Sequence, residues 1–355
     1  MVDAPAFAVA KGRDRADLFA FLDAASLGLR VADDGADLAS AGLGATALGA
    51  TDDFFAEVAR MLADAPAVFY PDRYDDHGKW MDGWESRRRR GPGHDHATVR
   101  LAAPGTIAGI DVDTSHFTGN YPPACSVEAC AVAGDPDDAT MWTELVPMAP
   151  LGPSAHHHLP IASDEVWTHV RLHIYPDGGV ARLRVYGTPH IDVEAQRGKT
   201  LDLASGLNGG RIIAWSDAHY GAMHRVLTPG RGLDMGDGWE TRRRRTPGND
   251  WLIVALGARG LIEAVELDTA HYKGNFPDSF SLLAADMGST RGSLTDSIVT
   301  ASMFWPELLA PEKLTADAIH TYDAVNALGP VTHVRLNIFP DGGVSRLRLF
   351  GKLAP

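Results

Sequence analysis

Apolar and polar residues alternate with a period of two in a long segment that occurs near the middle of the chain and again near its end. In VRLHIY, residues 170–175, valine, leucine and isoleucine alternate with arginine, histidine and tyrosine, and the turn-forming sequence PDGG follows. The alternation resumes after the turn in RLRVY, residues 182–186. Because successive side chains of a strand point to opposite faces, this pattern predicts a β-hairpin with one apolar face and one polar or aromatic face.

Shorter apolar runs predict further strands, and one stretch predicts a helix. TIAGIDVDT, residues 106–114, and LIEAVELDT, residues 261–269, are predicted strands that end at an Asp-Thr-x-His loop. In TDDFFAEVARML, residues 51–62, the apolar residues fall on one side of a helix that Thr51 or Asp52 could cap. Many short strands separated by Gly and Pro favour a β-sandwich or jelly roll, and the lack of alternating strands and long helices disfavours a Rossmann-like sheet.

The sequence contains an internal repeat of one module. The closing segment THVRLHIYPDGGVARLRVYG, residues 168–187, matches its copy at residues 332–351 at 15 of 20 positions. Three shorter motifs precede it in the same order in both halves: DLAS at 37–40 and 202–205, DGWESRRRR at 82–90 and DGWETRRRR at 237–245, and DTSHFTGNYP at 113–122 and DTAHYKGNFP at 268–277. A repeat of this length predicts two similar structural units.

These matches set the expected domain boundaries. We predict an N-terminal extension over residues 1–36, a first module over 37–187, a linker over 188–201 and a second module over 202–351. A chain of 355 residues is long enough for each module to have its own core.

Composition and charge restrict the partners. A formal net charge of −14 argues against a duplex nucleic-acid binder, which needs a basic face. No apolar run reaches membrane-spanning length, and we expect no secretory signal. Cys125 and Cys130 cannot make a disulfide framework and suit a reducing compartment. We therefore expect a cytoplasmic protein with neither nucleic acid nor membrane as a partner. We also expect a homo-oligomer.

Four consecutive arginines stand out in this acidic protein. If residues 86–90 are extended, Arg87 and Arg89 face one way while Arg88 and Arg90 face the other, so at most two converge on one ligand. Guanidinium groups bind carboxylates bidentately, which suits a small carboxylate better than a polyanion. The alternative is that these arginines pair with acidic residues of the protein itself.

The Asp-Thr-x-His-x-x-Gly-Asn-x-Pro loop offers the best set of catalytic residue types. It places a carboxylate, an imidazole and an amide at a strand-to-loop junction, where a rigid scaffold can present them. The alternative is a turn held by its own side-chain hydrogen bonds. The residues concerned are Asp113, His116 and Asn120 in the first module, and Asp268, His271 and Asn275 in the second.

Two further pairs of carboxylates recur in both modules. Glu85 follows Trp84, an apolar neighbour that could raise the pKa of the carboxyl, and Glu240 repeats the arrangement. Asp52 and Asp217 precede the predicted helix and its counterpart, where helix capping is favoured over catalysis.

The histidine-rich stretches invite a metal interpretation. The first module has GHDH at residues 93–96 and HHH at 156–158, with His169 in a strand, but the second has GNDW in place of GHDH. A metal site shared by both modules is therefore not supported. We expect no required cofactor, and a divalent metal such as manganese bound by the first module alone is the alternative.

The paired GWE-[ST]-RRRR motifs, the DTSHFTGNYP loop and the doubled PDGG segment together resemble the allantoicase family. The resemblance covers residues 37–351 and keeps the motif order in both repeats. It implies an all-β chain of two tandem galactose-binding-like jelly-roll modules with a few short helices. It also implies hydrolysis of allantoate to ureidoglycolate and urea, a step of purine degradation.

Allantoate is a small carboxylate whose central carbon carries two ureido arms. Its hydrolysis calls for a cation, for acceptors of the ureido N–H groups, and for an acid-base group that protonates the departing urea. Our hypothesis places the carboxylate on Arg88, Arg171 or their copies Arg243 and Arg335, the ureido groups on Asp113 with Asn120 or Asp268 with Asn275, and the proton on His116 or His271, with Glu85 or Glu240 as alternative base. We expect one dominant site per chain.

The competing hypothesis is a non-enzymatic tandem protein that binds carbohydrate or another small ligand. Jelly rolls of this type often serve as carbohydrate modules, and tandem copies raise avidity. The repeated residues here are charged, whereas sugar platforms favour exposed aromatic residues, so the enzyme hypothesis is preferred.

Overall fold

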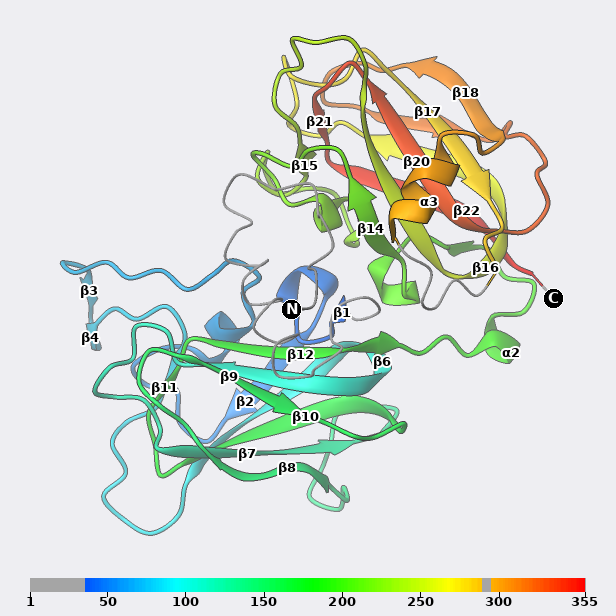
Figure 1. The fold of residues 1–355 in the computed structure, drawn as a ribbon. Coiled ribbons are helices and arrows are strands. Elements are labelled where there is room, and N and C mark those ends of the chain that lie inside the picture. Colours follow the sequence, from blue (N-terminus) through cyan, green and yellow to red (C-terminus); the bar gives the residue numbers. More distant parts are fainter. Residues whose placement is uncertain (1–35, 289–294, 355) are drawn as a thin grey trace, which may run out of the picture. The chain divides into compact units, whose positions relative to one another are not determined.

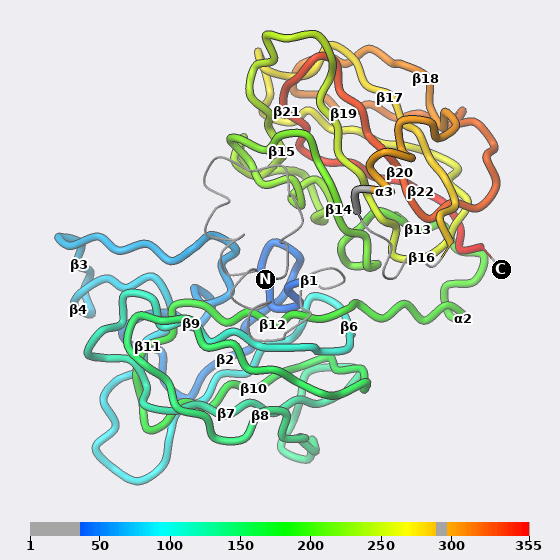
Figure 2. Tube along the Cα trace, viewed as in Figure 1, coloured from blue at the N-terminus to red at the C-terminus, as the bar shows by residue number. Residues whose placement is uncertain are grey.

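A computed structural model describes residues 36–288 and 295–354 of the protein (Figure 1). The chain divides into two compact units, and the division falls between His190 and Ile191. The course of the chain within each unit can be followed in Figure 2. Both units consist mainly of short strands, so the prediction of an all-β chain with two similar modules and a few short helices is confirmed.

The first unit contains twelve described strands and two short 3₁₀ turns between residues 36 and 190. They are β1 (Ala36–Asp37), η1 (Ala41–Leu43), β2 (Thr46–Ala50), η2 (Val58–Leu62), β3 (Tyr74–Asp75), β4 (Gly78–Lys79), β5 (Trp84–Glu85), β6 (Asp95–Asp113), β7 (Ala124–Cys130), β8 (Thr143–Pro150), β9 (His156–Pro160), β10 (Val166–Tyr175), β11 (Gly179–Val180) and β12 (Arg182–Pro189).

The 19-residue strand β6 takes part in both layers of this unit. Its first half pairs with β2 and β10, and its second half pairs with β9 and β12. The pairing with β2 ends at Arg100 and the pairing with β12 begins at Gly105, on either side of a segment that contains Pro104, while β10 still contacts Gly105 and Thr106. Strand β6 is therefore shared by two layers, β2-β6-β10-β7-β8 and β9-β6-β12-β1, as in a β-sandwich.

The core of the first unit lies between these two layers. Side chains at alternate positions of each strand are buried, as the period-two pattern predicts. The core includes Val99, Ile110, Leu172, Leu183 and Val185, which are all at most 1% exposed. The predicted strand over residues 106–114 is confirmed, since β6 ends at Asp113.

The second unit repeats this topology, with β16 in the place of β6. The predicted strand over residues 261–269 is confirmed as the second half of β16. The elements are α2 (Val193–Gln196), β13 (Leu201–Asp202), η3 (Gly206–Asn208), β14 (Arg211–Trp215), η4 (Met223–Leu227), β15 (Trp239–Glu240), β16 (Asp250–Asp268), β17 (Ser279–Ala285), α3 (Thr295–Ser302), β18 (Glu307–Lys313), β19 (Ile319–Tyr322), β20 (Val331–Phe339), β21 (Gly343–Val344) and β22 (Arg346–Leu353).

The predicted hairpin over residues 168–187 is wrong. Its two strands, β10 and β12, do not pair with each other, because each pairs with a different half of β6. The PDGG segment leads into β11, which pairs with β5. The chain therefore crosses from one layer to the other at PDGG, and the alternation that predicted two strands could not identify their partners.

The predicted helix over residues 51–62 is also wrong, because only Val58–Leu62 is helical. Ala56 forms an isolated bridge with Glu85, which keeps the preceding residues out of a helix. Asp52 caps no helix, since its carboxylate accepts hydrogen bonds from the backbone N–H and the Nε of Arg87, at 2.8 and 2.7 Å. Asp217 binds the corresponding Arg242 in the second unit.

The two units differ most in the segment before the GWE motif. The first has 20 residues over 63–82, and the second has 10 over 228–237. The additional residues include the β3-β4 hairpin, which projects from the first unit in Figure 1. Among the described residues, no helix is both long and apolar enough to cross a membrane.

Candidate active site

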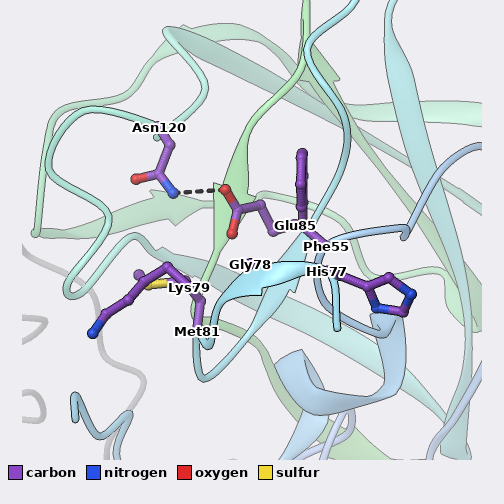
Figure 3. A pocket seen from close by; sticks show the side chains of 7 residues that line it. All are labelled: Phe55, His77, Gly78, Lys79, Met81, Glu85 and Asn120. Carbon is purple, nitrogen blue, oxygen red and sulfur yellow. Dashed lines mark hydrogen bonds between the residues drawn. The ribbon is translucent and has the colours of Figure 1, made fainter. Parts of the chain in front are cut away.

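A carboxylate and an amide from two repeated motifs meet in the first unit. Trp84 of β5 is fully buried and its indole N–H donates to the carbonyl of Asp52 at 2.8 Å. Glu85, the next residue, accepts a hydrogen bond on Oε1 from Nδ2 of Asn120 at 2.7 Å (Figure 3). The backbone of Asn120 is held in turn, because its carbonyl accepts from the N–H of Gly179 at 2.7 Å. The pair is therefore fixed by strand pairing on one side and by a defined loop on the other.

The Glu85–Asn120 pair lines a pocket of about 200 Å³. The other walls are Phe55, which precedes η2, and four residues of the segment that is longer in the first unit: His77, Gly78, Lys79 and Met81. In Figure 3 the amine of Lys79 points away from Glu85. It donates to the carbonyl of Tyr70 at 2.9 Å, so only the stem of this lysine faces the pocket.

The pocket changes the acidity of its carboxyl group. Burial raises the pKa of Glu85 above its ordinary value, and the hydrogen bond from Asn120 opposes part of that rise. A raised pKa keeps more of the carboxyl protonated near neutral pH, which is the state of a proton donor. The sequence suggested Trp84 as the cause, but the indole belongs to the core beneath the strand, and burial of Glu85 itself dominates.

The second unit has the same pair in a more closed setting. Glu240 accepts from Nδ2 of Asn275, and the carbonyl of Asn275 accepts from the N–H of Gly343 at 2.8 Å. Burial raises the pKa of Glu240, while Asn275 and His219 oppose the rise. Glu240 is only 8% exposed, and the hairpin that walls the pocket of the first unit has no counterpart here.

The four arginines of the first unit separate into two kinds. Arg87 pairs with Asp52, and Arg89 pairs with the buried Asp95. Arg88 is exposed and, within the described part of the chain, forms no hydrogen bond or ion pair. The second unit repeats the division, since Arg242 and Arg244 pair with Asp217 and Asp250 while Arg243 is exposed. Arg90 and Arg245 are likewise exposed and form no hydrogen bond or ion pair with described residues. Arg88, Arg90 and their copies therefore have charge available for a ligand, and Arg88 and Arg243 are the two that the sequence hypothesis named.

The other two candidate arginines are occupied by contacts within the protein. Arg171 donates to Glu128 at 3.1 Å and to Thr98 at 3.2 Å, and its guanidinium stacks over Trp142. Arg335 is 7% exposed and donates to Ser302 at 2.7 Å and to Asn337 at 2.9 Å. The partners of Arg171 and Arg335 do not include the Glu–Asn pairs.

The aspartates of the Asp-Thr-x-His loop hold the loop itself. Asp113 accepts from the backbone N–H of Ser115 at 2.7 Å, and Asp268 accepts from that of Ala270 at 2.8 Å. Both aspartates are buried, at 3% and 2% exposure. The structure therefore brings Asn120 to Glu85 and not to Asp113, with which the sequence hypothesis had grouped it.

The loop histidines also contact backbone. His116 and His271 have φ values of 70° and 69°, a left-handed conformation that is uncommon for residues other than glycine. Nε2 of His116 lies 3.1 Å from the carbonyl of Ala67, and Nε2 of His271 lies 2.8 Å from that of Gly232. Each ring nitrogen must donate to its carbonyl, so each histidine ties its loop to the segment before the GWE motif.

The histidine-rich stretches of the first unit form separate contacts. Nε2 of His94 lies 2.9 Å from Nδ1 of His173, whose Nε2 lies 3.2 Å from Glu128. His156 pairs with Asp111 at 2.7 Å. Within residues 36–288 and 295–354, no group of three or more His, Cys, Asp or Glu side chains is arranged to hold a metal ion.

The sequence hypothesis did not include His77, Lys79 and the other walls of the pocket. Except for Phe55, they lie in the segment 63–82, which is longer than its counterpart in the second repeat, so the search for shared motifs passed over them. The signal that could have found them is the length difference between residues 63–82 and 228–237.

The comparisons with known proteins agree with the repeat structure. The family model described as the allantoicase repeat matches residues 36–190 and again 201–354. The chain is 61% identical to a probable allantoicase of Rhizobium meliloti over 320 residues, which is 90% of this chain and 94% of that protein. It is 57% identical to a probable allantoicase of Burkholderia pseudomallei over 322 residues, which is 90% of this chain and 95% of that one.

A solved structure matches both units as well. The crystal structure of allantoicase from Saccharomyces cerevisiae has a TM-score of 0.77 and 32% sequence identity, over 96% of this chain and 99% of that chain. Two family repeats, whole-chain relatives and a shared two-unit fold lead to one conclusion: this chain belongs to the allantoicase family.

Proposed function

We propose that this protein is an allantoicase, which hydrolyses allantoate with one water to ureidoglycolate and urea, and that the pocket of the first unit is its main active site. The observation that carries the placement is the Glu85–Asn120 pair, which joins two family motifs at the wall of a pocket. The reaction breaks one bond between the central carbon and a ureido nitrogen, and it adds hydroxyl to the carbon and a proton to the nitrogen.

Glu85 is the proposed proton donor to the departing urea. Burial raises the pKa of its carboxyl, so the protonated form is available at the pH where an ordinary glutamate is ionised. After donation, the carboxylate can accept a proton from the attacking water or from the product hydroxyl. The sequence hypothesis gave this step to His116 and held Glu85 as the alternative, and the geometry favours the glutamate because Nε2 of His116 is already engaged.

Asn120 and Arg88 are the proposed substrate-binding groups. Nδ2 of Asn120 donates to Glu85, which leaves the side-chain amide oxygen Oδ1 of Asn120 to accept from a ureido N–H. Arg88 follows Glu85 by three residues and has no ion-pair partner among the described residues, so it can bind the carboxylate bidentately. Arg171 is less suited because it is already paired with Glu128.

The loop residues support this arrangement without touching the substrate in our proposal. Asp113 holds the loop by its hydrogen bond to Ser115, and His116 ties the loop to Ala67. The equivalent arrangement of the second unit is held by Asp268, His271, Asn275 and Glu240. We propose that the first unit dominates because its additional hairpin supplies the pocket wall.

Urea and ureidoglycolate released from allantoate by the purified full-length protein test this proposal. The matched variants are Glu85→Gln and Glu240→Gln, which keep side-chain size. We expect Glu85→Gln to lower kcat by about 100-fold or more, the usual contribution of general acid catalysis, and Glu240→Gln to retain most of the activity. No urea above the blank would refute the reaction, and binding of glycans without urea release would support the carbohydrate-binding alternative.

The remaining features of the proposal have their own tests. We propose no required cofactor, and the same assay with a chelator, followed by addition of manganese, tests for a metal. We also propose a cytoplasmic homo-oligomer; Cys125 and Cys130 are buried and unbridged, which suits a reducing compartment. Light scattering of the purified protein measures the oligomeric state.

A further inference from the structure

A histidine of the first unit lies between two buried aspartates. Strand β9 pairs with the second half of β6 so that His156 is opposite Asp113 and His158 is opposite Asp111. Nδ1 of His156 lies 2.7 Å from Oδ2 of Asp111, and its Nε2 lies 3.9 Å from Oδ2 of Asp113. Side chains two residues apart on one strand share a face, so this cluster follows from strand register.

The aspartates depend on nearby positive charge. Asp111 and Asp113 are 1% and 3% exposed, whereas the side chain of His156 is 46% exposed and in reach of water. The other charged or titratable groups that face this cluster are His158, with Nδ1 at 3.8 Å from Asp111, and two arginines of β12. Arg184 lies opposite Asp111 and pairs with Asp37, and Arg182 lies opposite Asp113 and pairs with Asp82. A buried carboxylate without a cation is strongly unfavourable, so the charge of His156 matters here.

In the second unit a different residue supplies the positive charge beside the loop aspartate. Ile319 occupies the position of His156, and the loop aspartate Asp268 is instead paired with Arg231, whose Nε lies 3.1 Å from Oδ2. Arg231 belongs to the segment before the GWE motif, at the position where the first unit has Pro66. The arginines opposite the two loop aspartates in the sheet, Arg182 and Arg346, pair with Asp82 and Asp237. The cation within 4 Å of the loop aspartate is an arginine in the second unit and a histidine in the first.

The cluster lies at the base of the loop that carries Asn120. Asp113 begins this loop, and the next residue, Thr114, donates from its backbone N–H to the carbonyl of Ala155 at 2.9 Å. Ser154 donates back to the carbonyl of Phe117 at 3.2 Å. The segment that ends in His156 is therefore bonded along the same loop whose Asn120 orients Glu85.

We propose that His156 is a positioning residue, whose protonated imidazole fastens β9 to Asp111 and Asp113 and thereby holds the Asn120 loop against Glu85. The structural part of this inference stands on the cluster alone, and its catalytic part rests on the proposed function. The second unit, with a permanent guanidinium, holds its loop independently of pH over the same range.

The direction of the pH effect follows from the ion pair. The hydrogen bond to Asp111 raises the pKa of His156 from 6.5 to about 9, with burial opposing. Stability from a raised histidine pKa is fully present below the unfolded value of 6.5 and is lost as the pH rises through about 9. Stability and activity of the first unit should therefore both fall on the alkaline side.

Three variants of the full-length protein test the proposal. His156→Arg supplies a permanent charge, His156→Gln removes it, and His190→Gln is the control that removes an exposed histidine of the first unit. We expect the thermal midpoint of the wild type to fall, relative to His156→Arg, by about 2–4 °C or more between about pH 6 and about pH 10. His156→Gln should have the lowered midpoint already at the acidic end, and His190→Gln should behave as the wild type.

Activity gives the second readout. The kcat for urea release should decline in the wild type as the pH rises through about 9, and this decline should be absent or shifted upward in His156→Arg. The proposal is overturned if His156→Gln and the wild type have the same thermal midpoints across the pH range, or if the thermal midpoint of His156→Arg falls on the alkaline side as much as that of the wild type. If no allantoate is hydrolysed, the proposed function fails, but the thermal measurement still tests whether the ion pair of His156 with Asp111 stabilises the first unit. If His156→Gln does not fold, the comparison of wild type with His156→Arg is sufficient.

Discussion

The pocket of the first unit depends on a buried arginine that holds the segment 63–82 in place. Arg182 of β12 is 2% exposed, and it donates to a carboxylate oxygen of Asp82 at 2.7 Å, to the backbone carbonyl of Asp82 at 2.9 Å and to that of Ala65 at 2.8 Å. These bonds fix both ends of the segment whose hairpin walls the pocket. Replacing Arg182 by Met keeps the volume of the side chain and removes the charge and all three bonds.

The magnitude follows from the burial of both partners. The carboxyl of Asp82 is 15% exposed, so Arg182→Met leaves a largely buried carboxylate without its cation. Removing one partner of a buried pair costs about 3–5 kcal/mol. The three hydrogen bonds are not an additional cost, because they belong to the same interaction. We therefore expect Arg182→Met to lower the free energy of unfolding of the first unit by about 3–5 kcal/mol.

The second unit supplies the matched control. Arg346 donates to Asp237 at 2.7 Å in the same arrangement, but the shorter segment there has no hairpin. Hydrogen exchange followed by mass spectrometry resolves peptides of each unit and so measures both effects separately. Arg182→Met should raise the KM for allantoate as well as exchange in residues 63–82, while Arg346→Met should destabilise the second unit with little change in KM. A loss below about 1 kcal/mol in Arg182→Met would refute this reasoning.

Three further predictions concern Glu85 and Arg88. Burial raises the pKa of Glu85, so its ionised form opposes folding. Glu85→Gln should therefore increase the thermal midpoint at neutral pH while activity is lost. An unchanged or lower midpoint contradicts this account. For the same reason the activity of the wild type should fall as the pH rises through the raised pKa of Glu85, measured as kcat against pH. Arg88→Ala should raise the KM for allantoate with a small effect on kcat, whereas Arg90→Ala, a change at an equally exposed arginine, should leave both near the wild-type values; equal effects would argue against a carboxylate contact at Arg88.

The local pattern of the sequence was sufficient for several strands and for the C-terminal end of β6, but it missed where β6 and β10 begin. Alternation over residues 170–175 placed Leu172 and Ile174 in the core, and the apolar run before Asp113 ended where β6 ends. These features depend on neighbours within a few residues, which any sequence displays. The partners of a strand are not local, and the hairpin prediction failed because β6 accepts β10 on one half and β12 on the other.

The same distinction applies to the helix predicted at residues 51–62. Its apolar spacing was real, since Val58 and Met61 are buried. However, Asp52 is bound by Arg87, 35 positions later, and Ala56 is bridged to Glu85. Contacts with a distant segment overrode the local preference for a helix.

The sequence by itself determined the duplication, the strand-rich class, the family resemblance and the residue types available for chemistry. It named Glu85 and Asn120 but grouped Asn120 with Asp113, its neighbour in the same motif. Only the tertiary structure decided that Asn120 bonds to Glu85, that Asp113 holds its own loop beside His156, and that the hairpin of one repeat walls a pocket. The physical reason is that motifs record which groups are kept together along the chain, whereas hydrogen bonds, burial and charge pairing depend on distances that folding sets.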